Sequence, residues 1–331
     1  MRSSEPVRWG VLGTGGISAR LLEGARRSPA VDVVAAGSRT PATATAYAAR
    51  NAIPTAHGSY EALLADPRVE AVYIAVPNGL HHPWTMRALA AGKHVLCEKP
   101  YSSDPAEVES AFDAADAAGL VLSEAFMWRH HPQVAHLRKM LPELGEIQTI
   151  RATFSFVLND AANIRLSQEL DGGSLMDVGC YCISGARLVA GEEPELAFGV
   201  AETGATGVDV RFTGVLRFPG GIGAEFTSGF TADHRGLEVI GRAGSVRLTD
   251  PWQSNPATIV RDGIETRLDE ADPYQLELED VGRAIRERRP PLLGRSDALG
   301  QARTIAALRE SARTGRAVPV TREPAVAGGR G

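Results

Sequence analysis

Three side chains in this sequence, Lys99, Asp177 and Tyr181, are of types that hold or move a proton. Lys99 follows the apolar run His94–Cys97 and precedes Pro100, which biases the lysine backbone toward an extended conformation. Asp177 and Tyr181 are four residues apart, so on a helix they share one face at about 5–6 Å. An ammonium near a tyrosine lowers its pKa and stabilises a developing alkoxide. We expect Tyr181 to transfer the proton while Lys99 polarises the substrate oxygen, although the two roles can be exchanged.

A glycine-rich turn near the start of the chain could bind the phosphates of a dinucleotide. It follows a predicted strand and opens a predicted helix, and it reads Gly13-Thr14-Gly15-Gly16-Ile17-Ser18. The first glycine permits a tight turn, the second lets the backbone approach a pyrophosphate, and the helix N-terminus supplies N–H donors. Ser18 replaces the usual third glycine and is still small enough for close packing. The succession of strand, turn, helix and strand favours a dinucleotide site over an ordinary turn.

The end of the second predicted strand indicates which dinucleotide is bound. An NAD-binding domain places an Asp or Glu there to bind the ribose hydroxyls. This chain instead has Ser38-Arg39 and no acid. Because Arg makes bidentate, charge-assisted bonds to phosphate, we expect NADP(H) to be preferred, with NAD(H) as the alternative.

Several further residues are candidates for the same site. Asn78 and His81 follow the third predicted strand and should border the nicotinamide half of the cofactor, although His81 could equally make a structural hydrogen bond. Arg165 lies in a long connection of the kind that often carries substrate contacts, and it suits hydroxyls or a carboxylate. Arg129 is expected to line the substrate pocket, and Trp252 to offer an apolar platform for a substrate ring.

Three histidines, His130, His131 and His136, raise the question of a metal site. Adjacent histidines do not readily share one face of a helix or strand. No Cys or Asp accompanies them at ligand spacing. We therefore expect no metal, and a pocket-lining role for His131 is the alternative.

The first third of the chain alternates β-branched runs with alanine-rich stretches of helical periodicity. Such alternation predicts a parallel sheet with helices on both faces. The predicted strands are Val7–Leu12, Val31–Ala36, Ala71–Val76, His94–Cys97 and Val121–Leu122. The predicted helices are Ile17–Arg27, Ala42–Asn51, Trp84–Ala91 and Pro105–Ala118. We expect an α/β Rossmann domain, a doubly wound parallel sheet, over residues 1–124.

After residue 125, longer strands separated by glycine turns replace this alternation. The predicted strands are Ile147–Val157, Val208–Phe218, Gly223–Phe230, Leu237–Gly241 and Val246–Thr249. The predicted helices are Gly173–Val189, Tyr274–Arg288 and Ser296–Ser311. We expect an α+β domain over residues 125–321, with a large, mostly antiparallel, open-faced sheet for substrate binding and oligomerisation. Its last helix could pack back on the first domain, and residues 322–331 are expected to form a flexible tail.

The composition excludes several classes of protein. The 331 residues suit two domains, and the net charge of −5 without a basic run argues against nucleic acid as a partner. The sequence lacks a secretory signal pattern and an apolar stretch of the roughly 18–20 residues that span a bilayer. Cys97, Cys180 and Cys182 are odd in number and lack metal-like spacing, as expected of reduced thiols. We therefore expect a cytoplasmic protein that binds no membrane.

The motifs in order resemble one family over nearly the whole chain, the glucose-fructose oxidoreductase, inositol dehydrogenase and rhizopine catabolism (Gfo/Idh/MocA) family. They are the glycine turn, Pro77-Asn78-Gly79-Leu80-His81, Glu98-Lys99-Pro100 and the run from Gly172 to Tyr181. Tyr181 and the run from Glu124 to Arg129 are most similar to the branch of glucose-fructose oxidoreductases, dimeric dihydrodiol dehydrogenases and NADP-dependent xylose dehydrogenases. The inositol dehydrogenase branch would have a histidine in place of Tyr181.

The resemblance implies that Lys99 and Tyr181 act in proton transfer and substrate alignment with Asp177 alongside, and that Glu98 lies near the ribose of the cofactor. It also implies a homodimer or homotetramer and, often, a cis peptide bond before Pro100. The expected function is NADP(H)-dependent interconversion of an alcohol and a carbonyl on a sugar or related cyclic polyol. The alternatives are a sugar transhydrogenase that retains its cofactor and a non-catalytic NADP(H)-sensing regulatory protein.

Overall fold

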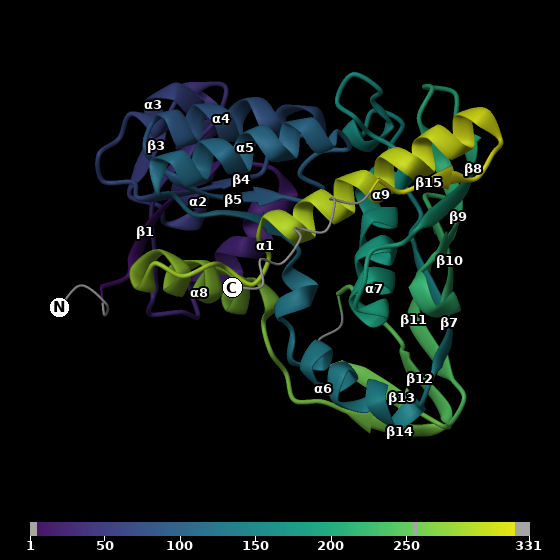
Figure 1. The fold of residues 1–331 in the computed structure, drawn as a ribbon. Coiled ribbons are helices and arrows are strands. Elements are labelled where there is room, and N and C mark those ends of the chain that lie inside the picture. The colour runs from purple at the N-terminus through teal and green to yellow at the C-terminus, as the bar shows by residue number, and fades with distance from the viewer. Residues whose placement is uncertain (1–4, 254–256, 322–331) are drawn as a thin grey trace, which may run out of the picture.

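The structure is a computed structural model that describes residues 5–253 and 257–321. Two sheets organise the chain, one on the left and one on the right of Figure 1, and a long helix crosses from the first to the second. The predicted tail, residues 322–331, lies outside the described residues.

The first sheet is a doubly wound parallel sheet, as the sequence predicted. Its six strands run in the order β3-β2-β1-β4-β5-β6, and all neighbours are parallel. The strands are β1 (Val7–Leu12), β2 (Val31–Gly37), β3 (Thr55–His57), β4 (Ala71–Ile74), β5 (His94–Glu98) and β6 (Leu122–Ala125). The helices between them are α1 (Gly16–Ala25), α2 (Pro41–Asn51), α3 (Tyr60–Leu64), α4 (His81–Ala90) and α5 (Pro105–Ala118). The strand order reverses between β1 and β4, which opens a crevice at the carboxyl ends of these two strands.

Local sequence explains where these helices begin. Thr40 and Asp104 cap the N-termini of α2 and α5 with their side chains, and a proline occupies the first turn of each helix. Proline suits that position because the N–H it lacks would have no partner inside the helix. Every residue of β4 is buried, as expected of a central parallel strand.

The second sheet is mixed and mostly antiparallel. Its nine strands run in the order β14-β13-β12-β11-β7-β10-β9-β8-β15, and only β7 and β10 are parallel neighbours. The longer strands are β7 (Ile147–Ser155), β8 (Leu196–Thr203), β9 (Asp209–Arg217), β10 (Gly223–Gly229) and β11 (His234–Gly241). The shorter strands are β12 (Gly244–Leu248), β13 (Thr258–Arg261), β14 (Ile264–Arg267) and β15 (Val318–Pro319).

One face of this second sheet is covered and the other is open. Helix α7 (Cys180–Ala190) packs on β7 and β10, whereas no helix lies on the opposite side of these strands among the residues drawn in colour in Figure 1. Alternate residues of β9 are accordingly buried and exposed. On the open face, Phe198, Val200 and Val215 are 38%, 55% and 47% exposed. The predicted open-faced sheet is therefore confirmed.

Two late helices connect the parts of the molecule. Helix α8 (Pro273–Glu287) packs on α1 and places Leu278 and Val281 in the core of the first sheet. Helix α9 (Arg295–Thr314) contacts α5 at one end and β8 at the other. A short helix α6 (Pro132–Met140) was not predicted. Because α8 and α9 pack back on the first sheet, a domain boundary at residue 125 stays a prediction.

Candidate active site

The glycine turn has the geometry of a phosphate-binding turn. Gly13 has φ +108°, and a Cβ there would lie 2.6 Å from the carbonyl oxygen of Ala75, so this position accepts only glycine. A Cβ at Gly15 or Gly16 would meet nothing within 4 Å, so the space beside these glycines is open to a ligand. Helix α1 begins at Gly16, and no side chain caps its N-terminus. Its free N–H groups therefore face the place where a pyrophosphate would bind.

Ser18 takes the place of the third glycine without loosening the packing. Its hydroxyl donates to the carbonyl oxygen of Gly15 at 2.6 Å and accepts from the hydroxyl of Tyr47 at 2.8 Å. Ser18 is fully buried. A small hydroxyl residue at this position therefore ties the turn to α1 and α2.

The end of β2 lies beside this turn. The hydroxyl oxygens of Thr14 and Ser38 are 3.3 Å apart. Arg39 is exposed between β2 and Thr40, the N-cap of α2, and it is not among the residues that line the main cavity. Ser38 and Arg39 can thus reach only the end of a cofactor that extends from the turn across β2.

A cavity of about 730 Å³ runs from the glycine turn to the second sheet. From the first part of the chain it is lined by Gly15, Gly16, Ile17, Asn78, His81, Glu98 and Lys99, among others. From the second part it is lined by Phe154, Phe156, Arg165, Asp177, Tyr181, Arg235 and Tyr274, among others. The predicted catalytic residues and the predicted dinucleotide turn therefore share one cavity.

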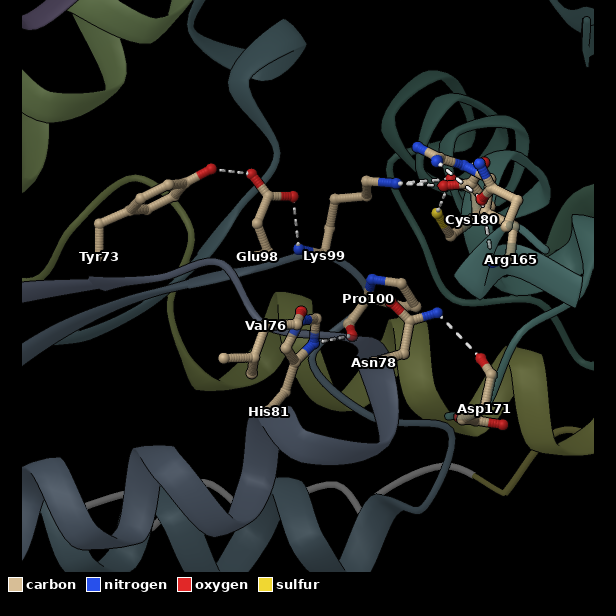
Figure 2. A network of polar contacts seen from close by, with 12 residues as sticks. Tyr73, Val76, Asn78, His81, Glu98, Lys99, Pro100, Arg165, Asp171 and Cys180 are labelled. Carbon is tan, nitrogen blue, oxygen red and sulfur yellow. Dashed lines mark hydrogen bonds and ion pairs between the residues drawn. The ribbon is translucent and has the colours of Figure 1, made fainter. Parts of the chain in front are cut away.

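Lys99 lines this cavity just beyond the carboxyl end of β5. Its Nζ donates to the backbone carbonyl of Asp177 at 2.6 Å, and it lies 3.5 Å from Oδ1 of the same residue (Figure 2). Arg165 Nε donates to Asp177 Oδ2 at 2.6 Å. The peptide bond between Lys99 and Pro100 is cis. The carboxylate of Asp177 thus lies between two cations.

Lys99 stays charged in this setting. Burial alone would lower its pKa, but its interactions with Cys180, Asp177 and Glu98 outweigh that cost and raise the pKa above its ordinary value. An ammonium held in this way is available to stabilise negative charge on a substrate oxygen.

Tyr181 presents its hydroxyl to the cavity. Its ring packs edge-on against Phe126 and Phe154, with centroids 5.4 and 5.2 Å away, and Lys99 Nζ lies 4.9 Å from its ring centroid. The hydroxyl has no hydrogen-bond partner in residues 5–253 or 257–321. Tyr181 is therefore fixed by its ring while its hydroxyl is left for a ligand.

The expectation that Lys99 lowers the pKa of Tyr181 is wrong for this structure. Burial raises the pKa of Tyr181 well above its ordinary value of 10.0, and nearby Tyr274, Glu98, Cys180 and Asp177 raise it further. The physical reason is placement, since the Lys99 ammonium lies over the face of the ring. Tyr181 is thus protonated at neutral pH, which suits a proton donor.

The turn that carries Asp177 also differs from the prediction. Residues Leu175–Gly179 form a π-helical turn that leads into α7, in place of a continuous α-helix from residue 173. Asp209 accepts hydrogen bonds from the Ser174 hydroxyl and the Leu175 N–H, both at 2.7 Å, and so caps this wide turn. Asp177 therefore lies on a π-helical turn and Tyr181 on the α-helix that continues it, and both side chains still line the cavity, as the sequence predicted.

Glu98 lines the cavity, and both oxygens of its carboxylate accept hydrogen bonds from neighbouring residues. One oxygen accepts a hydrogen bond from the Tyr73 hydroxyl and the other from the Lys99 N–H, as Figure 2 shows. Burial raises the pKa of Glu98, although Lys99 and Tyr73 act in the opposite sense.

His81 has the structural role that we gave as an alternative. Its ring nitrogens lie 2.9 Å from the carbonyl oxygens of Pro100 and Val76. Burial lowers its pKa to about 4. Although the ring lines the cavity, its hydrogen bonds hold the Lys99–Pro100 corner against the end of β4.

Three residues predicted near the substrate lie elsewhere. Arg129 pairs with Asp297 at 3.2 Å and donates to the Ser184 hydroxyl at 3.3 Å, outside the cavity, because the half-buried carboxylate of Asp297 on α9 attracts its guanidinium. His131 caps α6 by accepting from the Gln133 N–H. Trp252 is fully buried, and its indole N–H donates to the carbonyl of Thr153 at 2.8 Å. The substrate-contact role of Arg129 is therefore corrected to a bridge between η2 (Met127–His130) and α9.

The structure adds cavity residues that the sequence analysis missed. Phe154 lies in β7, and Phe156, just after its end, keeps the same two-residue spacing. Arg235 stands opposite Phe154 in the register of β7 and β11. The alternation could have indicated this face. Tyr274 enters the cavity only because α8 packs on α1, which no local pattern shows. In the described ranges, no cluster of three or more His, Cys, Asp or Glu side chains could hold a metal ion.

Comparison with known protein families shows which family the chain belongs to. Residues 7–126 match the model described as the oxidoreductase family with an NAD-binding Rossmann fold. Residues 134–247 match the GFO/IDH/MocA C-terminal domain. The chain therefore belongs to the Gfo/Idh/MocA family of oxidoreductases, and the resemblance stated from the motifs is confirmed.

Individual relatives are similar over most of their length. A D-xylose 1-dehydrogenase (NADP(+)) of Haloferax volcanii is 40% identical over 94% of this chain and 99% of its own. A trans-1,2-dihydrobenzene-1,2-diol dehydrogenase of Sus scrofa is 36% identical over 74% of this chain and 75% of its own. A 3-ketoreductase from Actinomadura kijaniata, solved with NADP and TDP-benzene, superimposes with a TM-score of 0.88 at 30% identity over 93% of this chain and 98% of its own.

Proposed function

We propose that this protein is an NADP(H)-dependent oxidoreductase that interconverts an alcohol and a carbonyl on a sugar or related cyclic polyol. The observation that carries the proposal is the meeting of Lys99, Asp177 and Tyr181 in the cavity that also holds the glycine turn. Relatives that act on D-xylose and on a dihydrodiol support the substrate class.

NADP(H) supplies the hydride acceptor or donor when it is bound. The residues of the chain then handle the proton: in the reduction the Tyr181 hydroxyl donates its proton to the substrate oxygen and becomes a phenolate, and in the oxidation that phenolate takes the proton of the substrate hydroxyl. Because Tyr181 is protonated at neutral pH, the oxidation first requires release of its proton to solvent. The Lys99 ammonium, held by the Asp177 carbonyl at 2.6 Å, stabilises negative charge on the same substrate oxygen. Arg165 balances the Asp177 carboxylate and faces the substrate. The reverse assignment, with Lys99 as the proton carrier, is tested below.

The cofactor side of the cavity fits a dinucleotide phosphate. The open N-terminus of α1 accepts a pyrophosphate, and the end of β2 offers a hydroxyl at Ser38 and a guanidinium at Arg39 without a carboxylate. An NADP-dependent relative and an NADP-bound structural neighbour support this preference. Binding titrations with NADP⁺ and NAD⁺ test it, and tighter binding of NAD⁺ would reject it.

The experiment that tests the activity is an oxidation screen with NADP⁺ and NAD⁺. Aldoses, inositols and trans-diols are offered, and the reduced nicotinamide is followed by its absorbance. We expect turnover with NADP⁺ on an aldose or a trans-diol. Activity confined to inositols with NAD⁺ would contradict the proposal. A transhydrogenase would purify with nucleotide bound and oxidise one sugar at the expense of another without added NADP⁺.

We also propose that the protein is a cytoplasmic homo-oligomer, a dimer or a tetramer. The open face of the second sheet exposes Phe198, Val200 and Val215, and two such faces can pack on each other. Cys97, Cys180 and Cys182 are free and buried, which agrees with a reducing compartment. No helix of the described residues has the length and apolarity to cross a membrane. Sedimentation velocity tests the oligomer, and a monomer at micromolar concentration would reject it.

A further inference from the structure

The loop of residues 163–173 delivers Arg165 to the active site and is built to return on itself. Asn163 caps its start by accepting from the Arg165 N–H at 3.2 Å. At its end the Gly173 N–H donates to the Arg165 carbonyl at 2.8 Å. A Cβ at Gly172 would lie 2.4 Å from that same carbonyl oxygen, so glycine is required where the end of the loop contacts its beginning. The position of Arg165 therefore depends on the turn at residues 170–173.

This turn is held from outside the loop. The Asn78 side-chain amide donates to the carbonyl oxygen of Asp171 at 2.9 Å, as Figure 2 shows. The Gly79 N–H donates to the carbonyl oxygen of Leu170 at 3.0 Å. Both donors follow β4, at the end of the cavity where the glycine turn lies. The substrate loop is thus hydrogen-bonded to the cofactor side of the crevice.

Arg309 of α9 makes the third external contact. One guanidinium nitrogen donates to Asp171 Oδ1 at 2.7 Å and another to the Ser103 hydroxyl at 2.7 Å. Ser103 belongs to the segment that follows Lys99 and Pro100. A single arginine therefore links the substrate loop, the segment after β5 and the C-terminal helix.

Asp171 adopts a backbone conformation that these contacts must maintain. It has φ +55°, in the left-handed region that non-glycine residues seldom occupy. Such a conformation persists where the surroundings over-determine it, and it is found often at functional sites. Asp171 touches none of the catalytic groups directly, so the chemistry itself does not account for the conformation.

We propose that Asp171 and Arg309 are positioning residues for the substrate. By pinning the turn against Asn78 and Ser103, they keep Arg165 on Asp177 and so set the affinity for the alcohol or carbonyl ligand. This inference rests on the proposed function for the identity of the ligand, but the positioning itself is a property of the loop.

The test compares variants of two arginines on the same helix. We call the contacts of Arg309 with Asp171 and Ser103 the clamp. Arg309→Gln removes the clamp, and Arg309→Lys keeps the positive charge. Asp171→Gly keeps the turn conformation while removing the carboxylate. Arg295→Gln is the matched control, because Arg295 bridges α9 to Asp113 and Asp116 on α5 and its side chain is 35% exposed, as is that of Arg309.

Two readouts are made on the full-length protein, hydrogen exchange with NADPH bound and steady-state oxidation kinetics with saturating NADP⁺. Hydrogen exchange of the 163–173 amides should rise at least fivefold in Arg309→Gln and Asp171→Gly, and stay unchanged in Arg295→Gln. With the alcohol that the wild type oxidises best in the screen, KM should rise at least fivefold in the same two variants. We expect kcat to stay within twofold, the Kd for NADPH to be unchanged, and Arg309→Lys to recover most of the wild-type KM.

Other results would overturn the inference. Loop exchange equal to that of the wild type in Arg309→Gln would show that the clamp does not hold the loop. Equal changes in Arg309→Gln and Arg295→Gln would show a general loss of stability. If the wild type oxidises no sugar, polyol or diol, the proposed function fails, whereas the exchange experiment still decides whether the clamp positions the loop.

Discussion

Replacing Tyr181 with Phe removes one hydroxyl and leaves the packing in place. The ring contacts with Phe126 and Phe154 and the Lys99 ammonium over its face do not involve the hydroxyl. Since the hydroxyl has no partner in the described parts of the chain, its loss should change the free energy of unfolding by less than about 0.5 kcal/mol. The melting temperature and the Kd for NADPH should therefore match those of the wild type.

The rate of the reaction should fall steeply in the same variant. A positioned general acid or base contributes about 10²–10⁴-fold to the rate, or about 3–5 kcal/mol of activation free energy. Steady-state kinetics in both directions measure this loss, and we expect it in kcat. A kcat within threefold of the wild type in Tyr181→Phe would refute the assignment of the proton to this residue.

The pH dependence distinguishes Tyr181 from Lys99 as the proton carrier. Because burial keeps the pKa of Tyr181 well above 10.0, the residue is protonated through the neutral range. Reduction, which needs the protonated form, should be nearly independent of pH from about 6 to 9, while oxidation should rise with pH. This rise should persist, at a lower rate, in Lys99→Met and disappear in Tyr181→Phe. The opposite pattern would assign the proton to Lys99.

Three further predictions concern the cofactor, the stability and the assembly. Arg39→Gln should raise the Kd for NADP⁺ by about 10- to 100-fold through loss of a charge-assisted bond while leaving that for NAD⁺ within twofold, and an equal effect on both would place the phosphate elsewhere. Burial raises the pKa of Glu277 above its ordinary value of 4.5, so its contribution to stability is present below that pH and declines as the pH rises. Glu277→Gln, which cannot titrate, should therefore melt at a higher temperature than the wild type by a margin that grows as the pH rises above about 4.5, and a margin that does not change with pH would contradict this reasoning. Val215→Glu should convert the oligomer to a monomer in sedimentation velocity, and an unchanged mass would exclude the open face as the interface.

The parts of the fold that depend on local sequence patterns could be predicted. Strands β1, β2 and β5 begin at the predicted residues and end within a residue of them, because a run of mostly apolar residues rich in valine and leucine is visible in the sequence itself. The glycine turn was recognisable for the same reason, since the φ of +108° at Gly13 and the close approach to Ala75 demand glycine. The family followed from several such motifs in a fixed order.

The parts that depend on distant contacts could not be predicted. The π-helical turn at Asp177 is capped by Asp209, which lies more than thirty residues away in sequence. Arg129 is drawn from the cavity by Asp297, whose position depends on how α9 crosses the molecule. The sequence analysis expected Trp252 to pack against a substrate ring. In the structure it packs against Trp128 and Phe154 in the core instead. In each case tertiary packing decided among side-chain roles that the sequence left open.

The two late helices have a consequence for how the protein is made. Leu278 and Val281 of α8 complete the core beneath β1, and α9 adds Ala298, Leu299 and Ala302 to the core on the other side of the same sheet. A nascent chain that has left the ribosome only as far as β6 therefore exposes apolar surface on both faces of its first sheet. Domains otherwise tend to fold as units from the N-terminus during synthesis. Here the core of the nucleotide-binding part is completed only after α8 and α9 have been made, so a product truncated before them would be a target for chaperones or proteases.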